Sequence, residues 1–380
     1  MEARKLYESW LANDYFDEAT KKELLEIQGD EKEIQERFYQ ELEFGTAGLR
    51  GIIGAGTNRM NEYTVQKATQ GIANYICKLK MENQGVAIAY DSRNKSTEFA
   101  LVAACCLAAN GIKAYLFEEL RPTPELSFAV RYFKCAAGIN ITASHNPKEY
   151  NGYKVYWADG AQITPPHDAG IMEQVRGIDD FKQVKMCSKE QALAAGLLVM
   201  IGHEVDDAYE QELLKQVLNP EIIQKNQDQI TIIYTPLHGT GNLPVRNILK
   251  KIGFEHVFVV EEQALPDGNF PTVSYPNPET KEAFELGLKL AKEKNADLIL
   301  ATDPDADRLG VQVRDAQGKY HSLTGNMSGC LLADYVVGQK QLKYGLPKDG
   351  VLIRSIVTTR LLDAIAKNYH LELIEVLTGF

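Results

Sequence analysis

The sequence contains neither a long apolar segment nor a cysteine framework. Its longest apolar run, residues 99–109, is far shorter than the ~20 residues that a membrane-spanning helix requires. The first residues, Met1-Glu-Ala-Arg-Lys, lack the apolar core of a signal peptide. None of the six cysteines shows Cys-x-x-Cys spacing, and Cys105-Cys106 lies in an apolar helical pattern. These absences exclude membrane-spanning and disulfide-stapled proteins and predict a cytoplasmic protein with reduced thiols.

An excess of positive charge is also absent. The chain has 41 Lys and Arg against 52 Asp and Glu, which gives a formal net charge of -11. Nucleic-acid binders need a basic face, so neither nucleic acid nor a membrane is expected as a partner. A length of 380 residues, with 44% hydrophobic and 24% charged residues, is typical of a globular protein with more than one domain.

One pattern occurs three times along the chain. In each copy, apolar strand patterns flank an amphipathic helix pattern, which is the signal of parallel α/β units. The three copies cover, as strand, helix and strand, residues 86–90, 96–109 and 113–117; 230–234, 242–251 and 256–260; and 351–356, 358–368 and 371–377. We therefore predict an α/β protein made of successive three-layer α/β domains of shared topology, with mixed or parallel sheets.

The first two copies continue alike, and each ends in a polar segment. A Pro-rich connection and a helix lead to a third apolar strand, at residues 138–142 in copy one and 296–301 in copy two. Thr142-Ala-Ser-His-Asn-Pro follows the first of these strands, and Asp303-Pro-Asp-Ala-Asp-Arg follows the second. Ligands of open α/β sheets bind at the carboxyl ends of the strands, so these two segments are the first candidates for chemistry.

The repeats predict the domain bounds. We expect a helical leader (1–40), a first domain (41–205), a second domain (206–318) and an incomplete third domain (319–380). Copy three stops after its second strand, without room for a further helix, strand and polar loop. A carboxyl-terminally truncated chain is therefore expected, with an unpaired sheet edge, exposed apolar surface and poor solubility.

The acidic segment favours a magnesium site. Asp303, Asp305 and Asp307 alternate after an apolar strand, and at ~6 Å spacing and an effective dielectric of about 20 each pair repels by roughly 3 kcal/mol. A cation removes this repulsion, and carboxylate oxygens without His or Cys suit Mg²⁺. An exposed acidic loop is the alternative. An EF-hand fails because Arg308 and Arg314 occupy its glycine and glutamate positions, and the pattern of haloacid-dehalogenase-type phosphatases fits poorly.

Four further residues near the polar segments are candidates for phosphate chemistry. Ser144, at a strand end, is a natural phosphoryl acceptor, although a Ser-His pair is also typical of a turn, and Gly-x-Ser-x-Gly is absent. Lys154 is a candidate acid/base, because a partly buried lysine beside cations loses its proton readily. Arg308 is a candidate phosphate ligand or a surface ion-pair partner. Arg50 ends a glycine-rich turn that does not match a Walker motif.

Together these segments resemble the α-D-phosphohexomutase family. Residues 142–147 with 151–154 resemble its phosphoserine loop, residues 303–308 its metal loop, and residues 44–50 its amino-terminal arginine motif. The leader and the run at residues 148–157 are most similar to the phosphoglucomutase/phosphopentomutase branch. The resemblance covers about residues 40–380 and implies four domains around one cleft, the first three of shared topology. The fourth domain and the family's sugar-recognition loop are expected to be absent from this chain.

The resemblance also implies site residues and a reaction. Ser144 would be phosphorylated in the resting enzyme, with Lys154 as acid/base, His145 as a nearby assistant and Arg50 as support. Substrate or bisphosphate would contact Arg50, Ser144, Arg308 and Thr378. Magnesium would be bound by Ser144, Asp303, Asp305 and Asp307.

The implied reaction is that of a phosphosugar mutase, an intramolecular phosphotransferase. Glucose 1-phosphate and glucose 6-phosphate would be interconverted through phosphoserine and glucose 1,6-bisphosphate. Phosphomannomutase and phosphopentomutase are the alternatives within the family. Two further alternatives are a metal-dependent phosphatase with Asp303 as nucleophile and a sugar-phosphate-binding fragment that is inactive because of the truncation.

Overall fold

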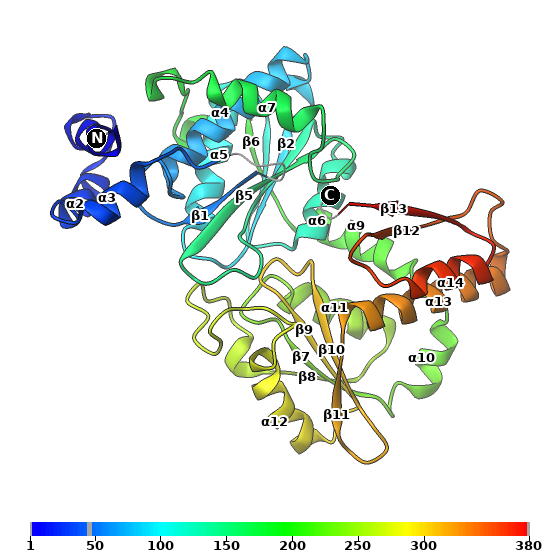
Figure 1. The fold of residues 1–380 in the computed structure, drawn as a ribbon. Helices are drawn as coiled ribbons and strands as arrows, with labels where there is room; N and C mark the ends of the chain where they lie inside the picture. The colour runs from blue at the N-terminus through cyan, green and yellow to red at the C-terminus, as the bar shows by residue number, and fades with distance from the viewer. Residues whose placement is uncertain (1, 44–47, 378–380) are drawn as a thin grey trace.

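The computed structural model describes residues 2–43 and 48–377 and shows a helical leader followed by three α/β units (Figure 1). The first and second units lie against each other, and the third extends to one side. The predicted α/β class with mixed sheets is confirmed. In the described part of the chain, no helix has the length and apolarity that crossing a bilayer would require.

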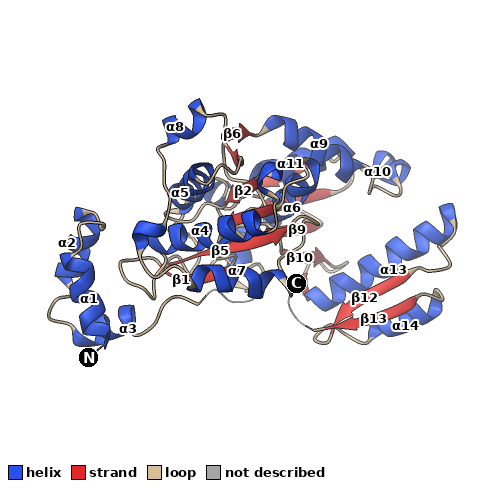
Figure 2. Cartoon of the chain, turned by 90° about the horizontal axis from the view of Figure 1, so that it is seen from above, coloured by secondary structure: helices blue, strands red, loops and turns tan. Residues whose placement is uncertain are grey.

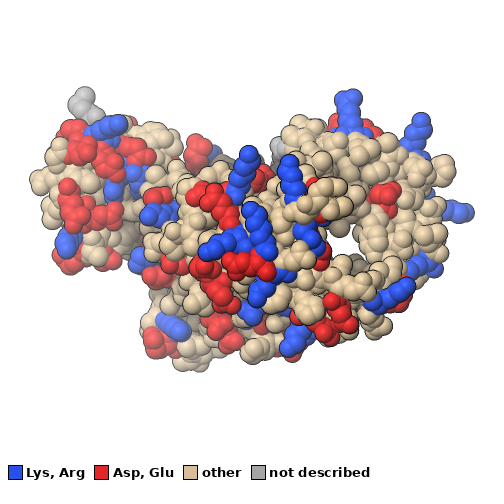
Figure 3. All heavy atoms as spheres, turned by 90° about the horizontal axis from the view of Figure 1, so that it is seen from below, with Lys and Arg blue, Asp and Glu red and all other residues tan. Residues whose placement is uncertain are grey.

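The leader consists of three short helices, α1 (Glu2–Ala12), α2 (Glu18–Glu26) and α3 (Glu31–Phe38). Aspartate side chains cap α2 and α3, so these helices begin where acceptors satisfy their free N–H groups. Figure 3 shows acidic side chains gathered over the leader, at the left of the view.

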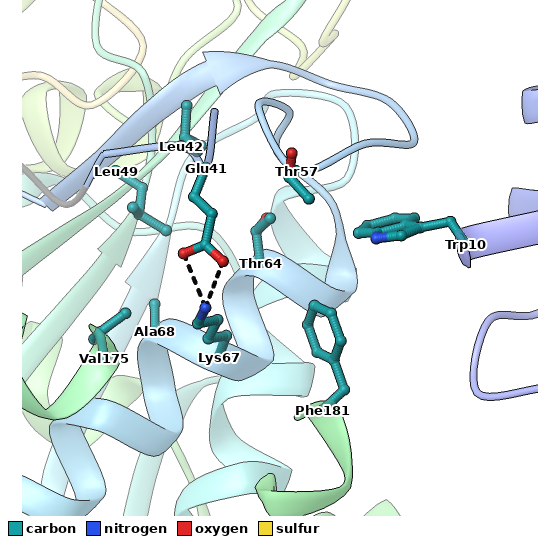
Figure 4. A pocket seen from close by; sticks show the side chains of 10 residues that line it. All are labelled: Trp10, Glu41, Leu42, Leu49, Thr57, Thr64, Lys67, Ala68, Val175 and Phe181. Atoms are coloured by element: carbon teal, nitrogen blue, oxygen red, sulfur yellow. Dashed lines mark hydrogen bonds and ion pairs between the residues drawn. The ribbon is translucent and has the colours of Figure 1, made fainter. Parts of the chain in front are cut away.

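An aromatic cluster attaches the leader to the first unit. Trp10 stacks on Phe16 with ring centroids 4.0 Å apart and meets Phe181 edge-on at 6.0 Å. Beside this contact, Lys67 Nζ lies 2.7 and 2.8 Å from the two carboxylate oxygens of Glu41, above a cavity of about 30 Å³ (Figure 4). A space of that size holds one water molecule, so the cluster is a packing contact and not a ligand site.

The first unit is built on a six-stranded sheet of order β1-β5-β4-β2-β3-β6. Its strands are β1 (Gly48–Ile52), β2 (Val86–Tyr90), β3 (Ala114–Phe117), β4 (Ala137–Ile141), β5 (Tyr150–Trp157) and β6 (Leu198–Ile201). The strands from β4 to β6 in this order are parallel, whereas β5 and β1 are antiparallel to their neighbours. Every residue of β2 and β4 is buried, as expected for central strands covered on both faces.

Helices cover both faces of this sheet. They are α4 (Glu62–Lys78), α5 (Ser96–Ala109), α6 (Thr123–Tyr132), α7 (His167–Arg176) and α8 (Lys189–Ala194), with two 3₁₀ turns, η1 (Glu82–Gln84) and η2 (Phe181–Gln183). Two more helices, α9 (His203–Leu214) and α10 (Pro220–Asn226), lead into the second unit. Helix α9 packs against both α6 and α11 (Asn242–Ile252), so it contacts both units.

The second unit has a five-stranded sheet of order β11-β10-β9-β7-β8. Its strands are β7 (Thr231–Thr235), β8 (His256–Val259), β9 (Leu298–Thr302), β10 (Leu309–Arg314) and β11 (Tyr320–Leu323). Strands β9, β7 and β8 are parallel and correspond to β4, β2 and β3, whereas β10 and β11 pair antiparallel with their neighbours, as β5 and β1 do in the first unit. Its further helical segments are η3 (Glu261–Gln263), η4 (Glu282–Phe284) and α12 (Glu285–Lys294).

The third unit is smaller. Helix α13 (Gly325–Tyr344) precedes β12 (Val351–Ser355), α14 (Leu361–Asn368) and β13 (Glu372–Val376), and the two strands form a parallel pair (Figure 2). The third strand–helix–strand copy is thus present as predicted. Several of its apolar side chains are exposed, including Leu332, Leu342, Ile353 and Leu377. This agrees with the predicted exposed apolar surface, and the consequence for solubility stays a prediction.

Candidate active site

Two polar loops meet at one cavity between the first and second units. The serine loop (residues 142–147) follows β4, and the acidic loop (residues 303–308) follows β9. Because β4 and β9 occupy the same position in their sheets, the repeated fold presents both loops from corresponding strand ends. The shared cavity has a volume of about 880 Å³, and its lining includes Arg50, Ser144, His145, Lys154, Asp307 and Arg308.

Ser144 makes direct contact with the acidic loop. Its hydroxyl donates to Asp303 Oδ2 at 2.9 Å, across 159 positions of sequence, and its Oγ lies 3.1 Å from His145 Nδ1. Only 4% of Ser144 is exposed. A serine placed in this way is neither an exposed turn residue nor a helix cap, and its oxygen lies beside the aspartates.

The three aspartates converge as a metal site would require. One carboxylate oxygen from each of Asp303, Asp305 and Asp307 lies within 4.8 Å of the other two. Asp303 and Asp305 are fully buried, and Asp305 Oδ1 has no hydrogen-bond partner among the described residues. The other oxygen of Asp305 accepts from Thr123 Oγ1 at 2.8 Å and Lys154 Nζ at 2.9 Å. An unpartnered buried carboxylate oxygen beside two further carboxylates fits a hard cation such as Mg²⁺.

The pKa shifts of the three aspartates also indicate that this site favours a positive charge. Burial and the Asp305 carboxylate raise the pKa of Asp303 well above its usual range. Burial also opposes ionisation of Asp305, but the Lys154 ammonium outweighs it and holds the pKa of Asp305 below the usual value. Burial and Asp305 raise the pKa of Asp307. A cation would favour the ionised form of all three carboxylates.

Lys154 lies in surroundings opposite to those expected from the sequence. Its ammonium contacts Asp305 at 2.9 Å and Asp307 at 3.6 Å. Burial opposes its charge, but these carboxylates win and raise the pKa of Lys154 above its ordinary value. The sequence led us to expect cations beside Lys154 and a readily lost proton, whereas its described charged partners are carboxylates, which favour the protonated form.

His145 is uncharged at neutral pH. Burial, with Arg308 and Arg50 nearby, lowers the pKa of His145 to about 4. Its Nδ1 lies within hydrogen-bonding distance of the Ser144 hydroxyl. The neutral imidazole thus presents Nδ1 beside Ser144 Oγ, and the lowered pKa makes it a weaker base than a free histidine.

The two arginines predicted to bind phosphate line the same cavity. Arg50, on β1, donates through Nη1 to Asn146 Oδ1 of the serine loop at 3.3 Å. Arg308 makes the ion pair considered as its alternative, with Glu279 at 3.6 Å, but both side chains are solvent-accessible and such pairs are weak. Both guanidinium groups are therefore available to an anion in the cavity. Thr378, the remaining predicted substrate ligand, lies outside the described residues.

Sequence reasoning missed three residues that hold the site together. Thr123 begins α6 and binds the acidic loop twice, by its N–H to Asp305 O and by its hydroxyl to Asp305 Oδ2, both at 2.8 Å. Asp91 and Arg93 follow β2 and contact the serine loop. A signal was present, since a charged Asp-Ser-Arg triplet directly after a buried strand lies at the sheet edge where ligands gather.

Comparisons with known proteins show the family of this chain. The description "Phosphoglucomutase/phosphomannomutase, alpha/beta/alpha domain I" matches residues 41–182, and the corresponding domain II description matches residues 207–318. A phosphoglucomutase of Staphylococcus haemolyticus is 39% identical over 347 residues, which are 91% of this chain and 61% of that protein. One of Staphylococcus epidermidis is 38% identical over 375 residues, 98% of this chain and 66% of that protein.

Solved structures share the fold at lower identity. A putative phosphomannomutase from Thermus thermophilus matches with a TM-score of 0.69 and 23% identity, covering 90% of this chain and 70% of that one. The open form of a Paramecium phosphoglucomutase, parafusin, matches with a TM-score of 0.68 and 20% identity, covering 90% and 63%. The chain thus spans about two thirds or less of the length of the curated relatives. It belongs to the phosphoglucomutase/phosphomannomutase family of α-D-phosphohexomutases.

Proposed function

We propose that this chain carries the phosphoryl-transfer centre of a phosphoglucomutase. In the proposed reaction, glucose 1-phosphate and glucose 6-phosphate are interconverted through phosphorylated Ser144 and glucose 1,6-bisphosphate. The observation that supports this best is the 2.9 Å contact between Ser144 Oγ and Asp303, buried beside two further aspartates. Glucose is favoured over mannose or pentose because the Staphylococcus relatives are named phosphoglucomutases.

Ser144, once phosphorylated, together with Asp303, Asp305 and Asp307, would hold Mg²⁺. When bound, the ion would neutralise the charge that develops on the transferred phosphoryl group. Within the described part of the chain, Asp305 Oδ1 has no competing partner, whereas Asp305 Oδ2 is already taken by Lys154 and Thr123. Metal binding and contact with the first unit therefore use different oxygens of one carboxylate.

The transfer is a displacement at phosphorus. The bond between phosphorus and Ser144 Oγ breaks, and a bond to a sugar hydroxyl oxygen forms. We assign the proton of the attacking hydroxyl to neutral His145, and the proton that Ser144 regains to protonated Lys154, so that charge and protons balance. The second transfer runs in reverse from the other phosphate of the bisphosphate and restores phosphoserine.

Arginines complete the proposed substrate site. Arg50 supports the phosphoserine and Arg308 contacts substrate or bisphosphate, both as guanidinium groups that pair with phosphate. Thr378 is proposed as a further bisphosphate contact. The proposed domains are the leader (1–40), domain I (41–205), domain II (206–318) and part of domain III (319–380). A cytoplasmic location is proposed with them, because all six cysteines are free thiols.

Peptide mass mapping after incubation with glucose 1,6-bisphosphate and Mg²⁺ tests the proposal. We expect phosphate on Ser144 in the wild-type chain, none in Ser144→Ala, and none at this position in Asp305→Ala. The matched control is Ser9→Ala, because Ser9 is an exposed serine of the leader. This variant should be phosphorylated at Ser144 like the wild type.

Two results would overturn the proposal. Phosphate on Asp303 that survives Ser144→Ala would indicate the metal-dependent phosphatase instead. Bisphosphate that binds without modifying any residue would indicate a sugar-phosphate-binding chain without transfer chemistry.

A further inference from the structure

A buried arginine lies beneath the serine loop and holds its backbone. Arg93 is 3% exposed, and its two terminal nitrogens donate to carbonyl oxygens of the serine loop and the residues just after it. These acceptors are the carbonyl oxygens of Ser144 and Asn146, both at 2.6 Å, Pro147 at 2.9 Å and Tyr150 at 3.1 Å. Four short bonds from one guanidinium fix the path of the loop over seven residues.

Asp91 holds the other side of the same loop. Its carboxylate accepts from Thr142 Oγ1 at 2.6 Å, from Ser96 Oγ at 2.8 Å and from the N–H of Arg93 at 3.0 Å. Thr142 Oγ1 in turn accepts the N–H of Ser144 at 2.8 Å. Asp91 thus orients the hydroxyl that receives the Ser144 amide, and we call Asp91 and Arg93 together the clamp.

Both peptide groups of Ser144 are therefore anchored, the N–H through Thr142 and the carbonyl by Arg93. This matters because Ser144 has φ +52°, in the left-handed region that side chains other than glycine disfavour. A residue stays in such a conformation only when its surroundings fix it. The conformation directs Ser144 Oγ to Asp303.

The clamp also meets the second unit. The Arg93 guanidinium lies 5.1 Å from the centre of the Phe270 ring, and the neighbouring Asn94 donates to Asn269 Oδ1 at 3.2 Å. Arg93 is thus packed between the serine loop and the unit that carries the acidic loop, with its side chain fully shielded from solvent.

We propose that Asp91 and Arg93 are positioning residues that hold Ser144 in its strained conformation and so align Oγ for phosphoryl transfer. The inference rests on the proposed function of Ser144. Neither residue reaches the reacting atoms, so each acts through the loop backbone. Loss of the clamp should slow transfer while leaving the cavity side chains that bind bisphosphate in place.

The test is the single-turnover rate of Ser144 phosphorylation, measured by intact mass against glucose 1,6-bisphosphate concentration with Mg²⁺. For Arg93→Met we expect the rate constant at saturation to fall at least about 100-fold, as for a misplaced reacting group. The half-saturating concentration should change less than about threefold. Arg59→Met is the matched control, because Arg59 is equally buried but pairs with Glu33 and Glu36 of α3. It should lose stability without this loss of rate.

Two milder substitutions at Thr142 keep the inference testable if Arg93→Met does not fold. Thr142→Val keeps the shape of the side chain but removes the acceptor for the Ser144 amide, whereas Thr142→Ser retains it. We expect Thr142→Val to slow phosphorylation about 10- to 100-fold and Thr142→Ser to stay within about threefold of the wild type. Guanidinium added to Arg93→Ala should restore part of the rate.

The outcomes separate the two proposals. A wild-type chain that is never phosphorylated on Ser144 overturns the proposed function. A wild-type chain that is phosphorylated, with folded Arg93→Met and Thr142→Val at the wild-type rate constant, overturns the positioning role alone. A rise in half-saturating concentration at an unchanged rate constant also overturns it, because that pattern indicates substrate binding.

Discussion

The serine loop and the acidic loop occupy the same place in two copies of one fold, yet they are held in different ways. Each follows the parallel strand that precedes the first antiparallel strand, β4 in one unit and β9 in the other. The serine loop is fixed from within its own unit, by Arg93 and Asp91. The acidic loop is held by its own unit, where the Thr240 N–H donates to Pro304 O at 2.9 Å, and also across the interface, by Thr123 and Lys154 of the first unit.

The difference shows how a duplicated scaffold yields two functions. The order of four strands repeats, β5-β4-β2-β3 in one unit and β10-β9-β7-β8 in the other, so both loops reach the cavity from corresponding strand ends. The serine loop is held by buried groups of its own unit, whereas the Asp305 carboxylate also bonds to Thr123 and Lys154 of the other unit. Changes in the serine loop should therefore affect phosphorylation of Ser144, and changes at the interface between the units should affect Mg²⁺ affinity.

The largest expected effect is on metal affinity. Asp305→Asn removes a carboxylate of the trio and the ion-pair partner of Lys154. We expect Mg²⁺ affinity, measured by titration calorimetry, to fall at least about 100-fold, more than for loss of an outer contact. Asp315→Asn, an aspartate of the same unit outside the trio, should leave the affinity unchanged. Equal losses of Mg²⁺ affinity in both variants would contradict the assignment of the three aspartates as the Mg²⁺ site.

A pair of glycines separates the two loops. An added Cβ would lie 2.4 Å from Thr142 O at Gly152 and 2.5 Å from Pro304 Cα at Gly239. Each Gly→Ala change should cost about 1–3 kcal/mol of unfolding free energy, as overpacking does. Gly152→Ala should mainly slow Ser144 phosphorylation, and Gly239→Ala should mainly weaken Mg²⁺ binding. If both variants change the phosphorylation rate and Mg²⁺ affinity by the same factors, the distinction between the two loops is contradicted.

A carboxyl pair behind the acidic loop predicts a pH dependence of stability. Glu125, on α6, faces Asp206 and Tyr209 of α9 and lies near Arg121. Burial and Asp206 raise the pKa of Glu125 to about 9. The folded chain therefore binds a proton that the unfolded chain releases, and stability from this group is lost as pH rises from about 4.5 toward 9.

Glu125→Gln tests this dependence because it mimics the protonated group. The difference in unfolding free energy between wild type and variant should shift by about 1 kcal/mol per pH unit between pH 5 and 8, in favour of the variant at higher pH. Chemical denaturation at several pH values measures it. The control is Glu119→Gln, because Glu119 is a largely exposed neighbour. If the difference for Glu125→Gln does not change with pH, the raised pKa of Glu125 is refuted.

The smallest effect is expected at the interface hydrogen bond. Thr123→Val removes the 2.8 Å bond to Asp305 Oδ2 and the 2.6 Å bond from Asn140 Nδ2, but leaves the trio intact. A hydrogen bond of this kind contributes about 1 kcal/mol, so Mg²⁺ affinity should fall about 3- to 10-fold. The Ser144 phosphorylation rate at saturating Mg²⁺ should change little. A larger effect on the rate than on affinity would show that Thr123 serves the serine loop instead.

Local pattern was enough to predict the repeated elements. The helix expected at residues 96–109 is α5, and the strands expected near residues 86–90 and 256–260 are β2 and β8. The chemical loops were also found, because polar residues directly after buried strands stand out in sequence. Ser144 and the three aspartates were predicted as one site, and the structure brings them together.

What sequence reasoning missed depends on contacts between distant segments. The antiparallel strands β5 and β10 were not predicted, since their pairing is not a local property. The run that forms β5 was interpreted as a continuation of the serine loop and as a mark of the family branch, but not as a strand. Arg93 and Thr123 had no distinguishing local signal beyond their place after a strand or a Pro-rich turn. The surroundings of Lys154 were predicted with the wrong sign, because the acidic loop reaches it from another unit.

The two oxygens of Asp305 place the candidate cation site and the contact between the two units on one carboxylate. One oxygen bonds to the first unit and the other, unpartnered by any described residue, is open to a cation. Coupling between two interactions of one group is reciprocal. Whatever free energy a bound cation adds to the contact between the units, or takes from it, that contact adds to cation binding, or takes from it, by the same amount.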